Sequence, residues 1–392
     1  MSAVKRLYIG WHSFWLRHRL LRLSGRLLTA LLSFLCLCLT AGVLAGMVFM
    51  ESSSDTALPP VSAGNPRQLF EMYMNNRLSD ALADLRSVEK VYWLSDEDPV
   101  APEPDAAAFG ETDDEAVLNR LLEDAADLLD GQSLYFDPRR ERMPESTVRY
   151  YLDETILAIA WKEVHNHCVY TFSEVKIAHP SQFRRFLSGG AYGTAQQFLT
   201  TEMSKSVNAV TASSGDFYGY RDYGTVVYGG TLYRYDGILD LCLVDEQGDL
   251  RFLRAGSIPG REELEQYIRD NAIRFSFAFG PVLVEDGQRV YNRYYPVGEI
   301  DEEYSRAALC QMDTLHYLVA AANMEPFYYR VPTLNEFTMR IAETGCRMAY
   351  TLDGGQTAAI TMNHRLVNQV SYGSQRRISD IFYFATALPD GG

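Results

Sequence analysis

The stretch of sequence with the clearest chemical content is 348–357, where an apolar run ends in Asp-Gly-Gly. The run Met-Ala-Tyr-Thr-Leu is typical of a buried strand, and it would place the carboxylate of Asp353 at the edge of a sheet. The two glycines that follow free the next peptides to bend or to approach a ligand closely. Gly345, just before the run, is a helix stop signal, so we expect a helix, a turn, a strand and then the Asp-Gly-Gly loop. The alternative is an ordinary hairpin turn, because Asp-Gly is among the strongest hairpin-turn pairs.

Further segments place charged residues next to apolar runs, in an order that resembles a known family. They are 208–218, which ends in Ser-Ser-Gly-Asp-Phe-Tyr, the Phe-Gly-Pro at 279–281, the Arg-containing stretch 304–309, and Thr-Leu-Asn-Glu-Phe at 333–337. Together with Leu-Asp-Gly-Gly at 352–355, they resemble motifs of the phosphodiester glycosidase family, which includes the uncovering enzyme of the lysosomal sorting pathway and many bacterial envelope proteins. The resemblance covers roughly the last 240 residues, which is the length of one domain.

The sequence departs from the family pattern at four positions but keeps its charged residues. Ser214 stands where the family usually has Asn. Ala307 replaces a Thr, and Cys310 and Gln356 each replace a Gly. The carboxylates and the arginine of the motifs are in place. A non-catalytic descendant of the family therefore stays an alternative.

Hydrolysis of a sugar-1-phosphodiester needs carboxylates near the developing oxocarbenium ion, and cationic and N–H donors near the departing phosphate. The resemblance implies three catalytic carboxylates, which are Asp216, Asp353 and Glu336. It also implies substrate contacts by an arginine that clamps the phosphate and by small or polar loop residues, which are Arg306, Ser214, Gly215, Gly354, Gly355, Gln356 and Thr357. Further candidates near these motifs are Arg221, Asp222 and Arg376. The structural alternatives are a helix cap for Glu336, an ion pair for Arg306 and a turn for Asp216.

The first fifty residues contain six basic residues and no acidic residue, and 27–50 carries no charge. A helix over 27–50 would be about 36 Å long, enough to cross a hydrocarbon core of about 30 Å. The basic residues before it, with Glu51 and Asp55 after it, orient the amino terminus to the cytoplasm. We therefore predict a single-pass anchor in the cell membrane, with the carboxyl-terminal domain outside the cytoplasm. The alternative is a cleaved signal peptide with its site at 43–45.

The chain after the predicted anchor is strongly acidic. Removing the six amino-terminal positive charges from the net charge of −15 leaves −21 for the rest. Such a charge argues against binding of nucleic acid or of an anionic lipid surface. No metal or other cofactor is predicted, because the remaining four cysteines lack Cys-x-x-Cys spacing and the His-Asn-His at 165–167 is typical of an exposed turn. We expect these cysteines to be buried thiols, although two disulfides are allowed outside the cell.

The patterns divide the chain into a basic tail and anchor at 1–50, an acidic linker and helical stalk at 51–140, and a phosphodiester glycosidase-like domain at 141–392. Apolar residues at helical spacing predict helices over 66–95 and 115–129, separated by an acidic loop rich in Pro and Ala. This stalk could pack on the domain or pair with a second copy, which would make a homo-oligomer.

From residue 148 onward the sequence is dominated by strand signals. The stretches 154–161 and 169–177 are rich in β-branched and aromatic residues, which favour strands. Helices are expected over 182–187 and 194–204. These features predict an α+β domain with a large mixed sheet and helices inserted between strands.

Two classes of function are consistent with the sequence. The first is a membrane-anchored glycosidase that hydrolyses sugar-1-phosphodiester linkages in envelope glycopolymers or exopolysaccharide. The alternative is a non-catalytic glycan-binding or scaffold protein of envelope polysaccharide assembly. Release of free sugar from a sugar-1-phosphodiester would distinguish the first class from the second.

Overall fold

The computed structural model describes residues 100–297 and 300–387, and the structural statements that follow concern these residues. The predicted anchor, the linker and the helix expected over 66–95 lie outside them. Within the described part of the chain, no helix is both long enough and apolar enough to cross a membrane. All described residues belong to one compact unit of the fold.

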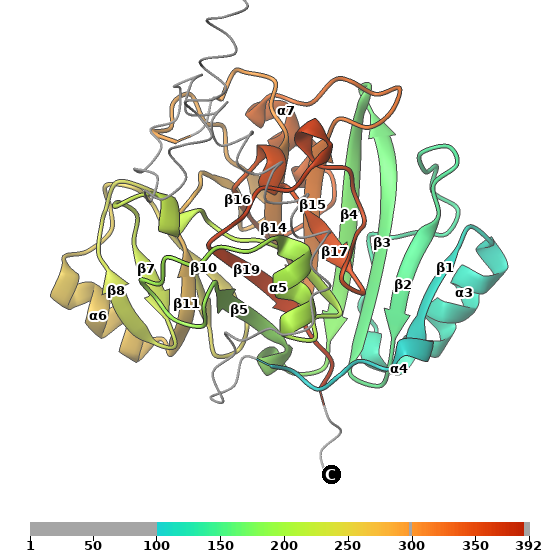
Figure 1. The fold of residues 1–392 in the computed structure, drawn as a ribbon, viewed down its shortest axis with the longest axis horizontal. Coiled ribbons are helices and arrows are strands. Elements are labelled where there is room, and N and C mark those ends of the chain that lie inside the picture. Colours follow the sequence, from blue (N-terminus) through green and yellow to red (C-terminus); the bar gives the residue numbers. More distant parts are fainter. Residues whose placement is uncertain (1–99, 298–299, 388–392) are drawn as a thin grey trace, which may run out of the picture. The chain divides into compact units, whose positions relative to one another are not determined.

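The unit is built from three sheets (Figure 1). The first has nine strands, in the order β1 (Phe109–Thr112), β2 (Val148–Leu152), β3 (Ile156–His165), β4 (Cys168–Ile177), β15 (His316–Asn323), β14 (Arg306–Asp313), β16 (Met348–Leu352), β12 (Val282–Glu285) and β13 (Gln288–Arg289). The second has five strands, in the order β10 (Leu250–Leu253), β9 (Leu241–Asp245), β11 (Ile273–Phe277), β7 (Val226–Tyr228) and β8 (Thr231–Arg234). The third has five strands, in the order β18 (Arg365–Leu366), β17 (Ile360–Met362), β6 (Thr211–Ser214), β19 (Asp380–Phe384) and β5 (Phe183–Leu187).

Helices are short and few among the described residues. The α-helices are α3 (Glu115–Asp124), α4 (Ala126–Leu129), α5 (Thr200–Ser206), α6 (Arg261–Asp270) and α7 (Leu334–Ala342). The 3-10 turns are η1 (Ala106–Ala108), η2 (Pro180–Gln182), η3 (Tyr218–Tyr220), η4 (Gly355–Thr357) and η5 (Ser371–Gly373). The predicted α+β class is therefore confirmed.

The predicted mixed character of the large sheet is wrong. Every pairing between the strands named above is antiparallel. The physical reason is that β3 and β4, and likewise β14 and β15, are joined by tight turns, which only antiparallel neighbours allow. The His-Asn-His segment lies in the first of these turns, as predicted.

The large sheet is buried on both faces. On one face α3 and α7 pack against side chains such as Trp161, Phe172 and Cys310. On the other face the two smaller sheets pack against residues such as Val175 and Leu309. Burial on both faces explains why all ten residues of β4 are buried, including polar and charged ones such as Glu174 and Lys176.

Part of the predicted stalk packs on this sheet. The helix expected over 115–129 is present as α3 and α4. The stretch before it, which was expected to be a loop, contains β1, and this strand pairs with β2. Leu118 and Phe136 belong to the core, and the backbone N–H groups of Tyr135 and Phe136 each donate to the buried carboxylate of Glu174 at 2.7 Å. The predicted boundary at residue 141, where an independently folding domain would begin, stays a prediction.

Two helices expected from the sequence differ in the structure. The segment expected to be helical over 182–187 is strand β5, which pairs with β19. An apolar segment of this length has no distinctive helical period, and its pairing with a strand almost 200 residues away decides its conformation. The helix expected over 194–204 begins only at Thr200. The four cysteines are buried free thiols, as predicted.

Candidate active site

The Asp-Gly-Gly loop follows β16 as predicted, and it is not a hairpin turn. β16 pairs with β14 and β12, whereas the next strand in the chain, β17, belongs to a different sheet. The backbone N–H of Asp353 donates to the carbonyl of Gly215 at 3.3 Å. The loop therefore joins the end of the large sheet to the segment that follows β6.

Glycine is required in this loop for close packing. A side chain at Gly354 would collide with the carbonyl oxygen of Ser305, and Gly355 adopts a φ of 68°, which disfavours other residues. The N–H of Gly355 donates to Ser305 at 3.0 Å, and the hydroxyl of Thr357 donates to Gly354 at 2.7 Å. The amide of Gln356 donates to Ser374 at 3.1 Å. These donors hold the loop itself, so the predicted array of ligand-binding donors is largely occupied within the protein.

The carboxylate of Asp353 is paired with Arg376, and the charge of Arg221 also acts on it. Arg376 donates a hydrogen bond to it from Nη2, and the side chains of both residues are almost buried. Burial raises the pKa of Asp353, while the charges of Arg376 and Arg221 and the hydroxyl of Thr357 act in the opposite direction. The net effect is a raised pKa, so the fold disfavours the ionised form relative to an Asp in water.

The two arginines retain N–H groups that no described residue accepts. Arg376 lies over the rings of Phe217 and Tyr220, at 4.6 and 5.1 Å from their centroids, and its Nε has no hydrogen-bond partner among the described residues. Arg221 donates from Nη2 to the carbonyls of Asp216 (2.7 Å) and Ala278, while its buried Nε and Nη1 are likewise unpartnered in the described chain. We call Asp353, Arg221 and Arg376 the Asp353 cluster. The cluster combines one negative carboxylate with two positive guanidinium groups, so positive charge is in excess.

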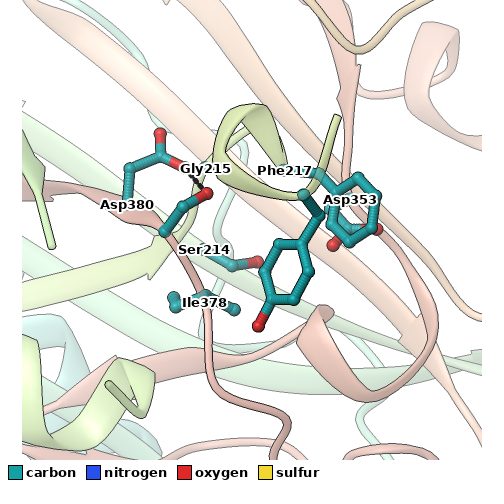
Figure 2. A pocket seen from close by; sticks show the side chains of 8 residues that line it. Ser214, Gly215, Phe217, Asp353, Ile378 and Asp380 are labelled. Atoms are coloured by element: carbon teal, nitrogen blue, oxygen red, sulfur yellow. Dashed lines mark hydrogen bonds between the residues drawn. The ribbon is translucent and has the colours of Figure 1, made fainter. Parts of the chain in front are cut away.

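The Asp353 carboxylate borders a narrow pocket (Figure 2). Its lining residues come from the ends of β6, β16 and β19 and from η3, and they are Ser214, Gly215, Phe217, Tyr220, Asp353, Ile378, Ser379 and Asp380. The pocket is too narrow to admit a water molecule. Phe217 and Tyr220 stack with their centroids 4.6 Å apart, and Phe217 has a left-handed φ of 66°. A ring held in this unfavourable conformation at the pocket wall is a feature that often accompanies function.

Asp216 belongs to a second, fully buried group, the buried triad, which it forms with Arg185 and Asp380. The guanidinium of Arg185 lies 3.1 Å from Asp216 and 2.7 Å from Asp380. The Asp216 carboxylate also accepts from the N–H groups of Tyr218 (3.0 Å) and Ala278 (2.8 Å). All of its contacts are therefore to the protein, which matches the structural alternative for this residue.

Asp380 is the more strained carboxyl of the buried triad. Burial raises its pKa to about 7; Arg185 opposes this shift, and the nearby charge of Asp216 adds to it. A side chain at Gly215 would collide with the Asp380 carboxylate, so glycine is required directly before Asp216. The buried Ser214 donates its hydroxyl to the carbonyl of Thr357 and connects the triad to the Asp-Gly-Gly loop.

Glu336 and Arg306 do not line the pocket. Glu336 caps α7: its carboxylate accepts from the Thr333 N–H at 2.9 Å and pairs with Arg330 at 2.7 Å. Partial burial acts to raise the pKa of Glu336, but the hydrogen bonds from Arg330 and Thr333 outweigh it and lower the pKa. Arg306 is buried at the start of β14, donates to the carbonyl of Glu302 at 2.8 Å and lies over the ring of Tyr304.

Arg306 is nevertheless close to Asp353 in register. Ala307 pairs with Leu352, so extending the antiparallel register by one residue places Arg306 opposite Asp353. The structure thus pairs Asp353 with Arg376, connects Asp216 to Arg221 through its backbone carbonyl and puts Glu336 at a helix start.

Five residues that line the pocket were not expected from the sequence, and neither was Arg185, which pairs with one of them; the five are Phe217, Tyr220, Ile378, Ser379 and Asp380. Asp380 carried a signal, because it is an acid next to the apolar run Ile-Phe-Tyr-Phe. No sequence signal pointed to Arg185, because its ion-pair partners lie far from it in the sequence.

Comparison with known proteins gives a family for most of this site. Residues 207–385 match the family model described as Phosphodiester glycosidase, which confirms the resemblance seen in the motifs and supports a glycosidase type of function. The match spans Asp216, Arg306, Glu336 and Asp353. None of the curated protein sequences matches the chain.

Two solved structures are similar to the described fold. One is the zebrafish N-acetylglucosamine-1-phosphodiester alpha-N-acetylglucosaminidase catalytic domain auto-inhibited by its pro-peptide, with 16% identity, a TM-score of 0.47, and coverage of 59% of this chain and 83% of that one. The other is a hypothetical protein from Synechocystis, with 13% identity, a TM-score of 0.42, and coverage of 60% of this chain and 64% of that one.

Proposed function

We propose that this protein is a phosphodiester glycosidase that hydrolyses a sugar-1-phosphodiester at the anomeric carbon. The observation that carries the proposal is the composition of the Asp353 cluster. The Asp353 carboxylate is paired with Arg376 and is also influenced by the charge of Arg221, and buried N–H groups of both arginines have no hydrogen-bond partner among the described residues. Such a cluster has the charge and the donors to take up one more anion.

A phosphodiester supplies an anion of matching charge. It carries a single negative charge at physiological pH, and a strongly acidic protein would repel it without a local cationic group. Guanidinium groups bind two phosphate oxygens at once. We assign the phosphate to Arg221 and Arg376, because both act on the Asp353 carboxyl and both retain N–H groups. The phosphate contact expected for Arg306 stays a prediction.

Asp353 is assigned to the sugar side of the linkage. Its ionised carboxylate would stabilise the positive charge that develops at the anomeric carbon as the bond to the phosphate oxygen breaks. The electron pair leaves with the phosphate, whose monoester is acidic enough to depart without a general acid. Water completes the reaction: its oxygen bonds to the anomeric carbon, and the proton it loses passes to the departing phosphate monoester or to solvent.

The narrow pocket must open for this reaction. The ring of Phe217, stacked on Tyr220 and under Arg376, is the natural moving part, because its left-handed backbone stores strain. Binding of a phosphate to Arg376 would compete with the hydrogen bond to Asp353 and would free the carboxylate for the sugar.

The alternative is a glycan-binding protein without turnover. Ser214 and Gln356, at positions where the family has other residues, favour it. For the hydrolase, we further propose attachment to the membrane through 27–50 and action on envelope glycopolymers or exopolysaccharide. This location rests on the uncharged run and the basic residues before it.

The test is release of free sugar by the full-length protein from the methyl phosphodiesters of glucose-1-phosphate, mannose-1-phosphate and N-acetylglucosamine-1-phosphate. We expect release by the wild-type protein and loss by roughly 10²–10⁴-fold in Asp353→Asn. Asp270→Asn is the control, because Asp270 is an exposed acid at the end of α6, outside the candidate site. Binding of these compounds without release of sugar would support the glycan-binding alternative instead.

A further inference from the structure

We propose that four exposed aromatic residues beside the candidate site bind the neutral sugar chain of a polymeric substrate. They are Tyr304, Phe327, Tyr329 and Tyr372, which we call the aromatic rim. The inference rests on the proposed function, and it adds the substrate class: a neutral polysaccharide in which the phosphodiester is one linkage, rather than a small sugar conjugate.

The rings are unusually open to solvent. The exposed fractions are 40% for Tyr304, 89% for Phe327, 73% for Tyr329 and 72% for Tyr372. Large aromatic side chains normally contribute to the core, as most of them do in this sheet, so several exposed rings at one place indicate a binding surface.

Hydrogen bonds and ion pairs bring the three segments that carry the rings together. The hydroxyls of Ser305 and Ser371, each next to a rim tyrosine in the chain, lie 2.7 Å apart. The carboxylate of Glu325 accepts from the N–H of Gln369 at 3.0 Å and connects the Phe327 turn to the Tyr372 segment.

The third connection places Tyr329 beside Tyr304. Arg330 pairs with Glu303 at 3.0 Å, so the residues adjacent to both tyrosines are held together. The N–H of Tyr304 also donates to the carbonyl of Pro332 at 3.3 Å. All these segments meet near the beginning of α7, at one end of β14 and β15 (Figure 1). The three segments that carry the four rings therefore lie side by side.

The aromatic rim adjoins the candidate active site directly. The Tyr304 ring packs against the Asp-Gly-Gly loop so closely that a side chain at Gly355 would lie 2.8 Å from its hydroxyl. The guanidinium of Arg306 lies 5.8 Å from the centroid of the same ring. A chain bound along the rim would thus reach the end of β16, where Asp353 lies.

The backbone holds two of the rings in unfavourable conformations. Phe327 has a φ of 71° and Tyr372 a φ of 59°, both in the left-handed region that residues other than glycine avoid. Phe327 is held in a short turn whose ends, Glu325 and Tyr328, exchange backbone hydrogen bonds at 2.9 Å. Exposed aromatic residues kept in strained turns indicate selection for what the rings contact, since neither burial nor backbone preference explains them.

The chemistry of the rim favours a neutral sugar chain. The C–H face of a pyranose ring packs on an aromatic ring, and tyrosine hydroxyls supply polar contacts at the ring edge. The exposed acids Asp301, Glu302 and Glu303 lie next to Tyr304 and would repel an anionic polymer or an anionic membrane surface. The negative charge of the substrate is therefore expected only at the phosphodiester, where the arginines lie.

The test uses the full-length protein and a triple variant, Phe327→Ala with Tyr329→Ala and Tyr372→Ala. These three side chains are mostly exposed, so the fold should be retained. Two probes are compared. The first is a mannan whose sugar chain is neutral apart from its mannose-1-phosphodiester groups. The second is a small compound, the methyl phosphodiester of mannose-1-phosphate. We expect KM for the polymer to rise by roughly tenfold or more, with little change for the small compound. Tyr233→Ala is the matched control, because Tyr233 is an exposed tyrosine on β8, outside the rim.

Binding of the mannan, measured by calorimetry, separates this inference from the proposed function. If the wild-type protein binds the mannan and the triple variant does not, the inference holds even where neither protein releases sugar. Equal binding by both proteins, or no binding by the wild type, would overturn it. So would loss of vesicle binding or of self-association in the triple variant without any change in mannan binding.

Discussion

The Asp353 cluster and the buried triad contain the same kinds of side chain but are arranged for opposite purposes. In the buried triad, one guanidinium serves two carboxylates, and the Asp216 carboxylate is further saturated by backbone N–H groups. In the Asp353 cluster, one guanidinium pairs with the carboxylate and a second acts on it through its charge, and several N–H groups of the two arginines have no partner in the described chain. The comparison shows that two acids from similar motifs can have very different surroundings, which the motifs alone do not reveal.

The two groups differ in how many of their hydrogen-bonding atoms already have partners, and this difference suggests a different role for each. A buried carboxylate that already accepts several hydrogen bonds and an ion pair from the protein, as Asp216 does, stabilises one conformation and has little capacity left for a ligand. A cluster with an excess of positive charge and free donors stabilises an incoming anion. We therefore assign the buried triad to positioning and the Asp353 cluster to the substrate.

The largest effect is expected from Arg185→Met. The change leaves two carboxylates buried without their cation, and breaking such a group typically costs about 3–5 kcal/mol. Urea unfolding followed by fluorescence would measure the loss. Arg184→Met is the control, because the neighbouring arginine is only half-buried and donates to a backbone carbonyl. If both variants lose equal stability, the triad does not hold the site together.

The next effect concerns substrate affinity in Arg376→Met. Loss of a charged hydrogen bond to the phosphate should weaken binding of a slowly hydrolysed phosphodiester analogue by about 1.5–3 kcal/mol. Arg376→Lys should recover only part of it, because the planar fork is lost. Calorimetric titration measures both, with Arg377→Met as the neighbouring control. Unchanged affinity in Arg376→Met would remove this arginine from the phosphate site.

A shift in pH dependence should follow from the same arginine. Turnover needs the ionised Asp353, so activity is lost as the pH falls through a pKa that burial raises above the usual value for Asp. Arg376 opposes that increase, so Arg376→Gln should raise the pKa further and move the acidic limb of kcat/KM to higher pH. Profiles of wild type and variant on the same compound measure the shift. An acidic limb that stays in place, or moves to lower pH, is incompatible with this role of Asp353.

The smallest effect is expected from Glu336→Gln. The residue caps α7 and pairs with a partly exposed arginine, so stability should fall by only about 0.5–1 kcal/mol. Because its pKa is lowered in the fold, this contribution is present above the pKa of the unfolded chain and is lost as the pH falls. Thermal unfolding and sugar release measure the two consequences. A loss of turnover as large as that of Asp353→Asn would return Glu336 to the catalytic set.

The parts of the site that local patterns specify could be predicted from the sequence. The order of α7, β16 and the Asp-Gly-Gly loop follows from a capping box, a glycine stop and an apolar run. The role of Asp216 could not be predicted in this way, because its partners come from β5 and β19, which lie far apart in the sequence. Arg185 was hidden for the same reason, inside a segment that the sequence predicts to be a helix.

The assignment of arginines shows a second limit. Arg306 was expected to hold the phosphate because it lies in a family-like motif, whereas Arg376 lies in an irregular loop without a pattern. Only the arrangement of the loops shows that Arg376 reaches the Asp353 carboxylate. Residues of regular elements can be placed from period and register, but residues of loops cannot.

The most direct test of the division of labour is a matched pair of changes, Asp353→Asn and Asp216→Asn, each measured for unfolding temperature and for sugar release. Asp353→Asn should fold with an unfolding temperature at or above that of the wild type, because the fold disfavours its charge, and it should release almost no sugar. Asp216→Asn should unfold at a clearly lower temperature, because a buried charged contact with Arg185 is lost. Full sugar release by Asp353→Asn, or an unaltered unfolding temperature in Asp216→Asn, would contradict the account.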